Sequence, residues 1–351
     1  MLMTAHSAPL LALPCRPEEA DDFLSVPSES TIALVATMQG PVVVLGAGGK
    51  MGLHLCRMLK RAADAAGSKL KVIAVSRFST LRDRDSFASA GIETVSADLS
   101  IPEEVARLPD APVVFFLAGV KFGTAADPGL LEKMNVAMPR LVAERYRGAR
   151  IVAFSTGCVY PFVEPAAGGA RESTPASPAG DYAKSCLQRE LAFAEVSRRW
   201  GTQVVLIRLN YSVEFRYGVL VDIADKVRKN EPIDVSMGYV NLIWQPDALN
   251  HIIQSITVAS SPAVPMNITG AEVLRVRDLA HRAGELLGVQ ANVTGQETAT
   301  AWLSDASWSH RLFGAPPIPV ETMQRWIAAW LTNDGATWGK PTGFQKRDGK
   351  F

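Results

Sequence analysis

Two short stretches of the sequence place hydroxyl and thiol groups at spacings that suit proton transfer. In SPAGDYAKSCLQRE, residues 177–190, Tyr182 and Cys186 are four residues apart and share one face of a helix predicted over 182–199. In STGCVYP, residues 155–161, Thr156 and Cys158 follow a predicted strand. A free phenol titrates at about 10 and a free thiol at about 8.5, so both groups are mostly protonated at pH 7. We therefore expect proton donation here, with the alternative that both cysteines are small buried hydrophobes.

A glycine-rich turn precedes these groups. In VVVLGAGGKMGLHLC, Gly46, Gly49 and Gly52 lie between an apolar strand and an amphipathic helix, with Lys50 and Met51 among them. Glycines let the backbone turn tightly and approach a pyrophosphate, whose charge then meets the amino end of the helix. In this strand–turn–helix context the pattern predicts a dinucleotide site.

The second strand ends in AVSRFS, which carries no carboxylate to hold the ribose diol of NAD. Ser76 and Arg77 suit a 2′-phosphate instead, since the planar guanidinium pairs well with phosphate. We therefore expect NADP rather than NAD, with the alternative that Arg77 is a solvated loop residue.

The elements that must position these residues alternate along the chain. Apolar strands are predicted at 41–45, 71–76, 93–97, 112–118, 150–155 and 203–209, with helices at 50–65, 128–147 and 182–199. Continuous β-branched runs are typical of strands covered on both faces by helices, so the pattern predicts an α/β, doubly wound parallel Rossmann sheet. The boundaries we predict are an amino-terminal extension with a short helix (1–39), an NAD(P)-binding Rossmann domain (40–209), a smaller α/β substrate-binding region (210–335) and a flexible tail (336–351).

Composition excludes several classes of protein. The 351 residues carry a formal net charge of +1, which gives no electrostatic case for nucleic acid or an anionic membrane. No apolar stretch approaches the roughly 20 residues that span a bilayer. The four cysteines show no CxxC pair and the five histidines no metal-like spacing, so we expect a cytoplasmic protein with no metal site and no disulfide framework.

Several ordered motifs resemble the extended short-chain dehydrogenase/reductase family, also called the NAD-dependent epimerase/dehydratases. Besides the glycines, ADL with Asp98 and Leu99, LAGVKFG at 117–123, Asn135, STGCVYP and YAKSC match this family over about 40–335. The resemblance implies an enzyme in which Thr156 polarises a substrate oxygen and Tyr182 exchanges its proton. It also implies a homodimer formed by the helices near 128–147 and 182–199. The further cofactor contacts that it implies are Asp98, Leu99, Leu117, Ala118, Gly119, Lys121, Asn135 and Tyr182.

The sequence departs from the family at Cys186, where a lysine is expected four residues after the tyrosine. Lys184 cannot take over, because a residue two positions along points elsewhere on the helix. Lys121 is an alternative source of charge, and Cys158 resembles a proton-shuttling cysteine of GDP-fucose synthases and GDP-mannose 3,5-epimerases.

Two hypotheses follow for function. The first is an NAD(P)-dependent oxidoreductase or epimerase that acts on a hydroxyl or keto group of a carbohydrate-like small molecule held by Thr156, Asn210 and Arg216. Residues 235–247 contain no Lys or Arg to clamp a diphosphate, so we expect that this molecule is not a nucleotide sugar. The second hypothesis is a catalytically weakened dinucleotide-binding regulator or sensor of the same fold.

Overall fold

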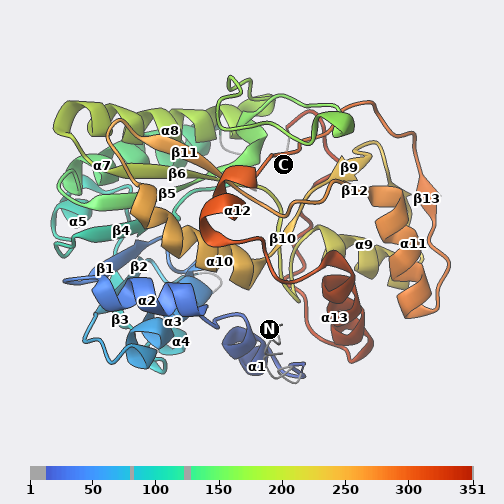
Figure 1. Cartoon of the computed structure of the whole chain (residues 1–351), viewed down its shortest axis with the longest axis horizontal. Coiled ribbons are helices and arrows are strands. Elements are labelled where there is room, and N and C mark those ends of the chain that lie inside the picture. Colours follow the sequence, from blue (N-terminus) through green and yellow to red (C-terminus); the bar gives the residue numbers. More distant parts are fainter. Residues whose placement is uncertain (1–12, 80–82, 122–127, 350–351) are drawn as a thin grey trace, which may run out of the picture.

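The computed structural model of the chain, described here for residues 13–79, 83–121 and 128–349, is built on one parallel sheet (Figure 1). Its seven strands run in the order β11-β6-β5-β4-β1-β2-β3, and every neighbouring pair is parallel. The strands are β1 (Val42–Leu45), β2 (Val72–Ser76), β3 (Glu93–Ser96), β4 (Val113–Phe116), β5 (Arg150–Thr156), β6 (Val204–Leu209) and β11 (Val264–Ile268). All four residues of β1 and of β4 are buried, as continuous apolar runs predict. The predicted doubly wound fold is confirmed.

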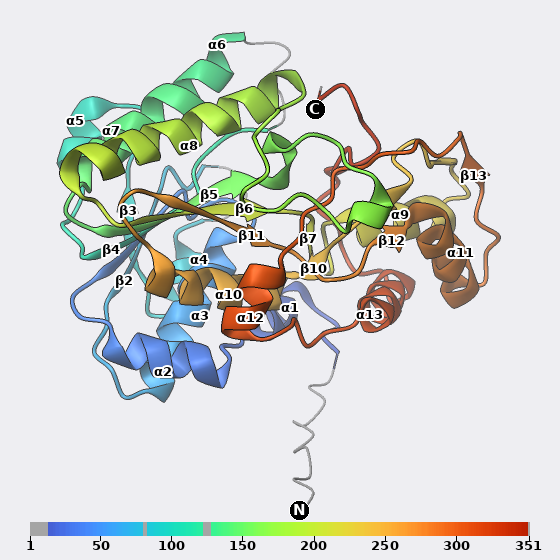
Figure 2. The same cartoon turned by 45° about the horizontal axis from the view of Figure 1, so that its top comes forward.

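Helices cover both faces of this sheet, as Figure 2 shows. One face packs against α2 (Glu29–Thr37), α3 (Gly52–Ala65) and α10 (Gln245–Gln254), and α4 (Asp85–Ala88) lies beside α3. The other face packs against α5 (Pro102–Ala106), α7 (Met138–Arg145) and α8 (Gly180–Trp200). The amphipathic patterns of α3 and α8 have the same cause, since each helix turns one apolar stripe toward the sheet.

The helix predicted near 128–147 is built in three parts. It begins as α6 (Pro128–Leu131), continues as a π-helical turn over Glu132–Ala137 and ends as α7. Such π-helical turns are rare and occur frequently at functional sites. Here the turn contains the buried Asn135.

The seventh strand shows that the expected boundary at residue 209 does not divide the sheet. β11 pairs with β6 along its whole length, and α10 packs on the same core as α3. Residues 245–268 therefore return to the half of the molecule that contains the seven-stranded sheet. The sequence of a five-residue apolar strand does not indicate which sheet the strand will join. We therefore assigned β11 to the smaller region from its position in the chain.

The smaller region surrounds a second core formed by α9 (Val219–Arg228), α11 (Val276–Leu287) and α13 (Val320–Thr332). Its strands are two-residue pairs: β7 (Ser212–Val213) with β10 (Ile243–Trp244), β9 (Tyr239–Val240) with β12 (Leu274–Arg275), and β8 (Ile233–Asp234) with β13 (Val293–Thr294). α12 (Ser307–Phe313) contacts β11 and α10 instead.

The amino-terminal extension forms two short helices where the sequence predicted one. The Ser28 side chain accepts a hydrogen bond from the Thr31 amide and so caps the start of α2. A further helix, α1 (Pro17–Phe23), precedes it. Its Ala20 and the following Leu24 belong to the second core, so tertiary packing stabilises a helix of only seven residues.

The carboxyl-terminal tail, expected to be flexible, packs against the body of the protein. Thr342 and Phe344 are buried, and the Trp338 indole donates to Glu214 Oε1 at 2.9 Å. Arg347 lies over the Phe162 ring, 4.1 Å from its centroid, and donates to the Thr300 carbonyl oxygen at 2.6 Å. Polar composition suggested fraying, but aromatic and ionic contacts to distant residues hold the tail in place.

Candidate active site

The glycine turn joins β1 to α3 and forms a cradle that larger side chains would fill. Gly46 has a φ of +81°, and a Cβ there would lie 2.6 Å from the Ala118 backbone nitrogen at the end of β4. A Cβ on Gly52 would overlap the Ala47 backbone. Gly49 is exposed, so the backbone before α3 is open to a ligand. This arrangement fits the pyrophosphate of a dinucleotide, whose charge the amino end of α3 would stabilise.

The end of β2 holds the residues predicted to meet the adenosine part of the cofactor. Arg77 is exposed, and its guanidinium lies 3.7 Å from Asp98 Oδ2. Asp98 Oδ1 accepts hydrogen bonds from the amide and hydroxyl of Ser100, and Leu99 is buried beside it. Ser76 Oγ accepts a long hydrogen bond of 3.4 Å from the Phe78 amide. Arg77 is thus shared between a nearby carboxylate and any phosphate that binds.

The residues after β4 line the same edge of the sheet. The Leu117 amide donates to the Leu45 carbonyl, which continues the pairing of β4 with β1 up to Ala118 and the exposed Gly119. The Asn135 side chain both accepts from the Val120 amide and donates to the Val120 carbonyl oxygen, each at 2.9 Å. The π-helical turn therefore fixes the backbone of this loop through one buried amide.

The predicted proton-transfer groups come together where β5 meets α8. Thr156 Oγ1 accepts from the Cys158 amide at 3.2 Å, and Cys158 belongs to the same buried apolar cluster as Ala183, the residue after Tyr182. Lys121 Nζ lies 5.7 Å from the centroid of the Tyr182 ring. Two segments that are distant in the sequence, 155–158 and 182–186, thus form one cluster with Lys121.

Burial controls the titration of this cluster. It raises the pKa of Tyr182 well above its usual value, and the neighbouring thiols of Cys186 and Cys158 raise it further. Burial also raises the pKa of both cysteines and lowers the pKa of Lys121. Desolvation disfavours each charged form. At neutral pH the phenol therefore retains its proton, so Tyr182 is equipped to donate a proton rather than to remove one.

A second lysine approaches from the glycine turn. Lys50 Nζ lies 3.2 Å from the centroid of the Tyr217 ring, and burial together with the charges of Lys121 and Lys340 lowers its pKa to about 7. Lys121 Nζ donates to the Thr342 carbonyl oxygen at 3.1 Å. The tail thus reaches the cluster of Tyr182, Cys158 and Lys121, which the sequence did not indicate.

Thr342 is held from its other side by Asp222 on α9. Asp222 Oδ2 accepts from the backbone amide of Thr342 at 2.7 Å and from its hydroxyl at 2.6 Å. The tail therefore lies between Lys121 and Asp222, and Lys340 brings a further positive charge to the same place.

Besides Thr156, two residues were predicted to hold substrate: Asn210 lies beside the cluster, whereas Arg216 does not serve that purpose. Asn210 is buried, and its side-chain amide donates to Asn241 Oδ1 at 2.6 Å. Asn210 Oδ1 lies close to Gly157, between Thr156 and Cys158, because a Cβ on this glycine would be 3.1 Å from that oxygen. Arg216 is 4% exposed and forms ion pairs with Glu214 and Asp21. An arginine committed to two carboxylates is not available to a substrate, so the structure corrects this prediction.

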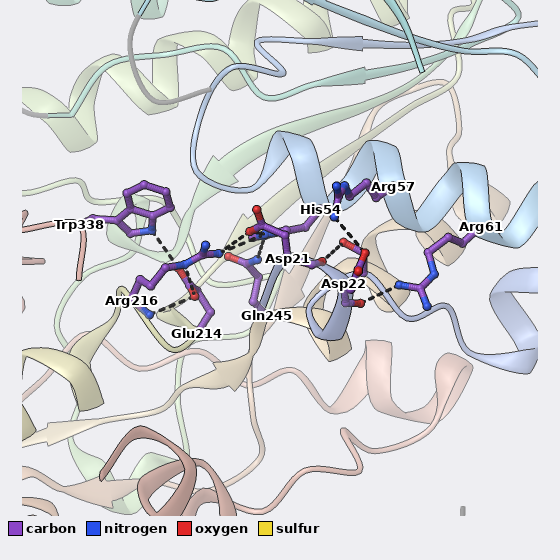
Figure 3. A network of polar contacts seen from close by, with 10 residues as sticks. Asp21, Asp22, His54, Arg57, Arg61, Glu214, Arg216, Gln245 and Trp338 are labelled. Carbon is purple, nitrogen blue, oxygen red and sulfur yellow. Dashed lines mark hydrogen bonds and ion pairs between the residues drawn. The ribbon is translucent and has the colours of Figure 1, made fainter. Parts of the chain in front are cut away.

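Arg216 belongs instead to a buried network that joins the amino-terminal segment to the cofactor half (Figure 3). Asp21 of α1 lies 2.8 Å from both Arg216 and His54 Nε2, and Gln245 Nε2 lies 2.6 Å from His54 Nδ1. The Gln245 amide donates to Nδ1, which leaves the His54 proton on Nε2 for Asp21. Since His54 is in the first turn of α3, the network fixes the helix that follows the glycine turn.

Sequence reasoning missed Arg189, which lies in the interior behind the catalytic cluster. This arginine is 6% exposed and follows Tyr182 by seven residues on the same face of α8. The seven-residue spacing was a usable signal, but a charged residue on a long helix usually lies in solvent.

Comparisons with known proteins identify the family and the fold. Residues 42–234 match the model of the family described as the NAD dependent epimerase/dehydratase family. No curated protein sequence matches the chain.

Many solved structures share the fold. The UDP-glucose 4-epimerase of Thermus thermophilus, solved with NAD, is 19% identical with a TM-score of 0.69, over 85% of this chain and 100% of that one. A dTDP-glucose 4,6-dehydratase of Bacillus anthracis, also with NAD, is 15% identical with a TM-score of 0.70, over 84% and 97%. MoeE5, in complex with UDP-glucose and NAD, is 17% identical with a TM-score of 0.68, over 84% and 99%. Identities this low show a shared fold and leave the substrate open.

Within the described ranges, no helix is both long and apolar enough to cross a membrane. The same part of the chain holds no group of three or more His, Cys, Asp or Glu side chains suited to a metal ion.

Proposed function

Because this chain belongs to the NAD-dependent epimerase/dehydratase family, we propose that it is an oxidoreductase or epimerase acting on a hydroxyl or keto group of a carbohydrate-like small molecule. The observation that carries the proposal is the cluster of Tyr182, Thr156 and Cys158 beside Lys121, at the carboxyl edge of the sheet and next to the glycine turn. Ligands of open parallel sheets bind at this edge.

The residues present fit a nicotinamide dinucleotide. Gly46, Gly49 and Gly52 would admit the pyrophosphate, Asp98 and Leu99 would face the adenine, and the segment Leu117–Gly119 would lie along the middle of the cofactor. When bound, the nicotinamide supplies or accepts a hydride at the substrate carbon.

The chain itself supplies the proton. Tyr182, kept neutral by burial, donates its phenolic proton to the substrate oxygen as a carbonyl is reduced. The Thr156 hydroxyl holds that oxygen. The reverse reaction needs ionised Tyr182, so it gains from positive charge nearby.

Cys158 provides the alternative within this mechanism. A thiol next to Thr156 is placed to exchange a proton at a carbon beside a keto group, which would make the reaction an epimerisation. Burial raises the pKa of this thiol, and the charge of Lys121 opposes the rise. Replacing Cys158 with alanine separates the two reactions, because simple carbonyl reduction does not need the thiol.

We propose NADP as the preferred cofactor, although the solved neighbours named above contain NAD. Support comes from Ser76 and Arg77 at the end of β2, where no carboxylate follows the strand. The ion pair of Arg77 with Asp98 weakens this preference, because a carboxylate already lies near the guanidinium. Arg77→Ala should reduce affinity for NADPH several-fold and leave affinity for NADH nearly unchanged.

The predicted exclusion of nucleotide sugars finds no support, because MoeE5 was solved with UDP-glucose. We therefore include both free and nucleotide-linked sugars in the substrate class. Lys50 and Lys121 bring two amino groups to the site, and burial lowers the pKa of both, that of Lys50 to about 7. A carboxylate or phosphate of the substrate would favour their protonated forms.

We further propose a homodimer formed by α7 and α8, which pack side by side on one face of the sheet. Leu191 of α8 is 46% exposed, which leaves an apolar side chain for a second copy to cover.

The test is turnover of keto sugars, aldonates, lactones and UDP- or dTDP-sugars with NADPH and NADH. Hydride transfer should occur in the wild type and fall by at least about 100-fold in Tyr182→Phe, as expected for loss of a general acid. Tyr146→Phe is the matched control, since that phenol donates to the Pro109 carbonyl oxygen away from the cluster. Cofactor binding without turnover would favour the second hypothesis, a dinucleotide-binding regulator. The contact between the tail and Lys121 would support that role.

A further inference from the structure

A buried arginine behind Tyr182 has neutral partners. The Arg189 guanidinium donates to the Phe154 carbonyl oxygen at 3.1 Å and to Asn135 Oδ1 at 2.6 Å. Within the residues that the structure describes, no carboxylate forms an ion pair with it. The adjacent Glu190 is bound instead to Arg208 at 2.7 Å. A buried charge without a counterion is costly, so we expect an anion to be present near Arg189 when the protein works.

The position of Arg189 is fixed by the loop that lines the site. Asn135 holds its guanidinium and is itself tied to both backbone groups of Val120 and to Ser185 Oγ. Gly119 lies directly over the guanidinium, where a Cβ would overlap its terminal nitrogen. Glycine at position 119 therefore lets the loop backbone and the charge approach each other closely.

Hydrogen bonds link Arg189 through Asn135 and Ser185 to the Tyr182 carbonyl. The charged and thiol groups that act on the pKa of Tyr182 or lie beside its ring come from three segments. Cys186 and Arg189 lie on α8, Cys158 follows β5, and Lys121 follows β4. Burial and the two thiols raise the pKa of Tyr182, whereas the charge of Arg189 opposes the rise. Glu190, on the same helix, acts on the pKa of Cys186 with the opposite sign to Arg189.

We propose that Arg189 supplies the positive charge that stabilises ionised Tyr182, in a protein whose residue 186 is an uncharged cysteine. This role rests on the proposed function. In carbonyl reduction the phenolic O–H bond breaks, the proton joins the substrate oxygen, and a hydride from a reduced nicotinamide joins the carbon. The tyrosinate that remains is the anion that Arg189 offsets until solvent returns a proton. Arg189 is thus a positioning residue, since its effect passes through Tyr182.

The test is the ionisation of Tyr182 itself, read without turnover. The full-length protein is labelled with 3,5-difluorotyrosine, whose phenol is more acidic than that of tyrosine, and the fluorine NMR signal lost in Tyr182→Phe identifies the residue. Titrations then compare wild type with Arg189→Met, Arg189→Lys and the double variant Cys186→Lys/Arg189→Met. Arg216→Met is the matched control, because it neutralises a buried arginine that pairs with carboxylates elsewhere.

We expect Arg189→Met to raise the apparent pKa of the labelled Tyr182 by about one unit, or about tenfold in the ionisation constant, because a buried positive charge is lost. Arg189→Lys should keep the wild-type value, and the double variant should restore it. If Arg189→Met does not fold, Arg189→Gln, which retains N–H donors for Asn135 and Phe154, takes its place.

Three results would overturn the proposal: an unchanged titration in Arg189→Met, an equal shift in Arg216→Met, or no recovery in the double variant. Where turnover is found, the pH at which kcat/KM levels off in alcohol oxidation should move with the same variants. A merely structural role would lower the rate equally at every pH. Absence of turnover together with the expected shift of the fluorine titration would refute the proposed function and leave the role of Arg189 intact.

Discussion

The ion-pair network at Asp21 predicts a large difference between two adjacent aspartates of α1. The Asp21 side chain is 10% exposed and contacts both Arg216 and His54, whereas the Asp22 side chain is 72% exposed and pairs with Arg57 at 3.0 Å. Replacing each with alanine removes the same chemical group from the same helix. The difference in stability between the two variants therefore measures the effect of burying the ion pair.

The expected cost follows from what each replacement leaves behind. Removing one partner of a buried pair costs about 3–5 kcal/mol, and Glu214 remains beside Arg216, so we expect Asp21→Ala to cost about 3 kcal/mol. Asp22→Ala should cost less than about 1 kcal/mol, because exposed ion pairs contribute little. With an unfolding entropy of about 2 cal/mol/K per residue over the 351 residues, 3 kcal/mol lowers Tm by about 4 °C.

Thermal unfolding followed by calorimetry, with urea titration as a second measurement, tests this expectation. The effect of Asp21→Ala should persist in high salt, since buried pairs are screened little, while any effect of Asp22→Ala should vanish. Equal shifts for the two variants, or a shift in Asp21→Ala that disappears with salt, would show that the network does not stabilise the fold.

Two further predictions concern the cofactor site and the response to acid. Gly46→Ala should weaken NADPH and NADH binding at least about tenfold by fluorescence titration, because the new Cβ meets Ala118 and the φ is positive; Gly148→Ala, with nothing within 4 Å, should bind normally. Burial, together with the charge of His310, lowers the pKa of His251 to about 4. The unfolded state then binds the extra proton below about pH 6.5, so the wild type should lose up to about 3 kcal/mol relative to His251→Leu between pH 6.5 and 4. A constant difference between the two proteins across that range in urea unfolding would contradict this assignment.

The features that local sequence determines were predicted well. The glycine turn and the parallel strands of the first half of the chain each depend on residues within one strand or turn. The fold class and the family follow from them.

The features that were missed depend on pairing between distant residues. β11 pairs with β6 although more than 50 residues separate them. Arg216 binds Asp21 near the amino terminus, and the tail contacts Lys121. The spacing of apolar residues along one strand or helix does not indicate which distant residue it will contact. Arg189 was missed for a related reason, because its burial depends on Asn135 and Phe154 rather than on its own helix.

A crystal structure of the protein soaked with NADPH or NADH tests the central claim most directly. We predict density for the dinucleotide across the carboxyl edge of the sheet, with its pyrophosphate at Gly46–Gly52 and its nicotinamide within reach of both Tyr182 and Thr156. A cofactor bound elsewhere, or one whose ring lies on the far side of the tail from Tyr182, would contradict the account.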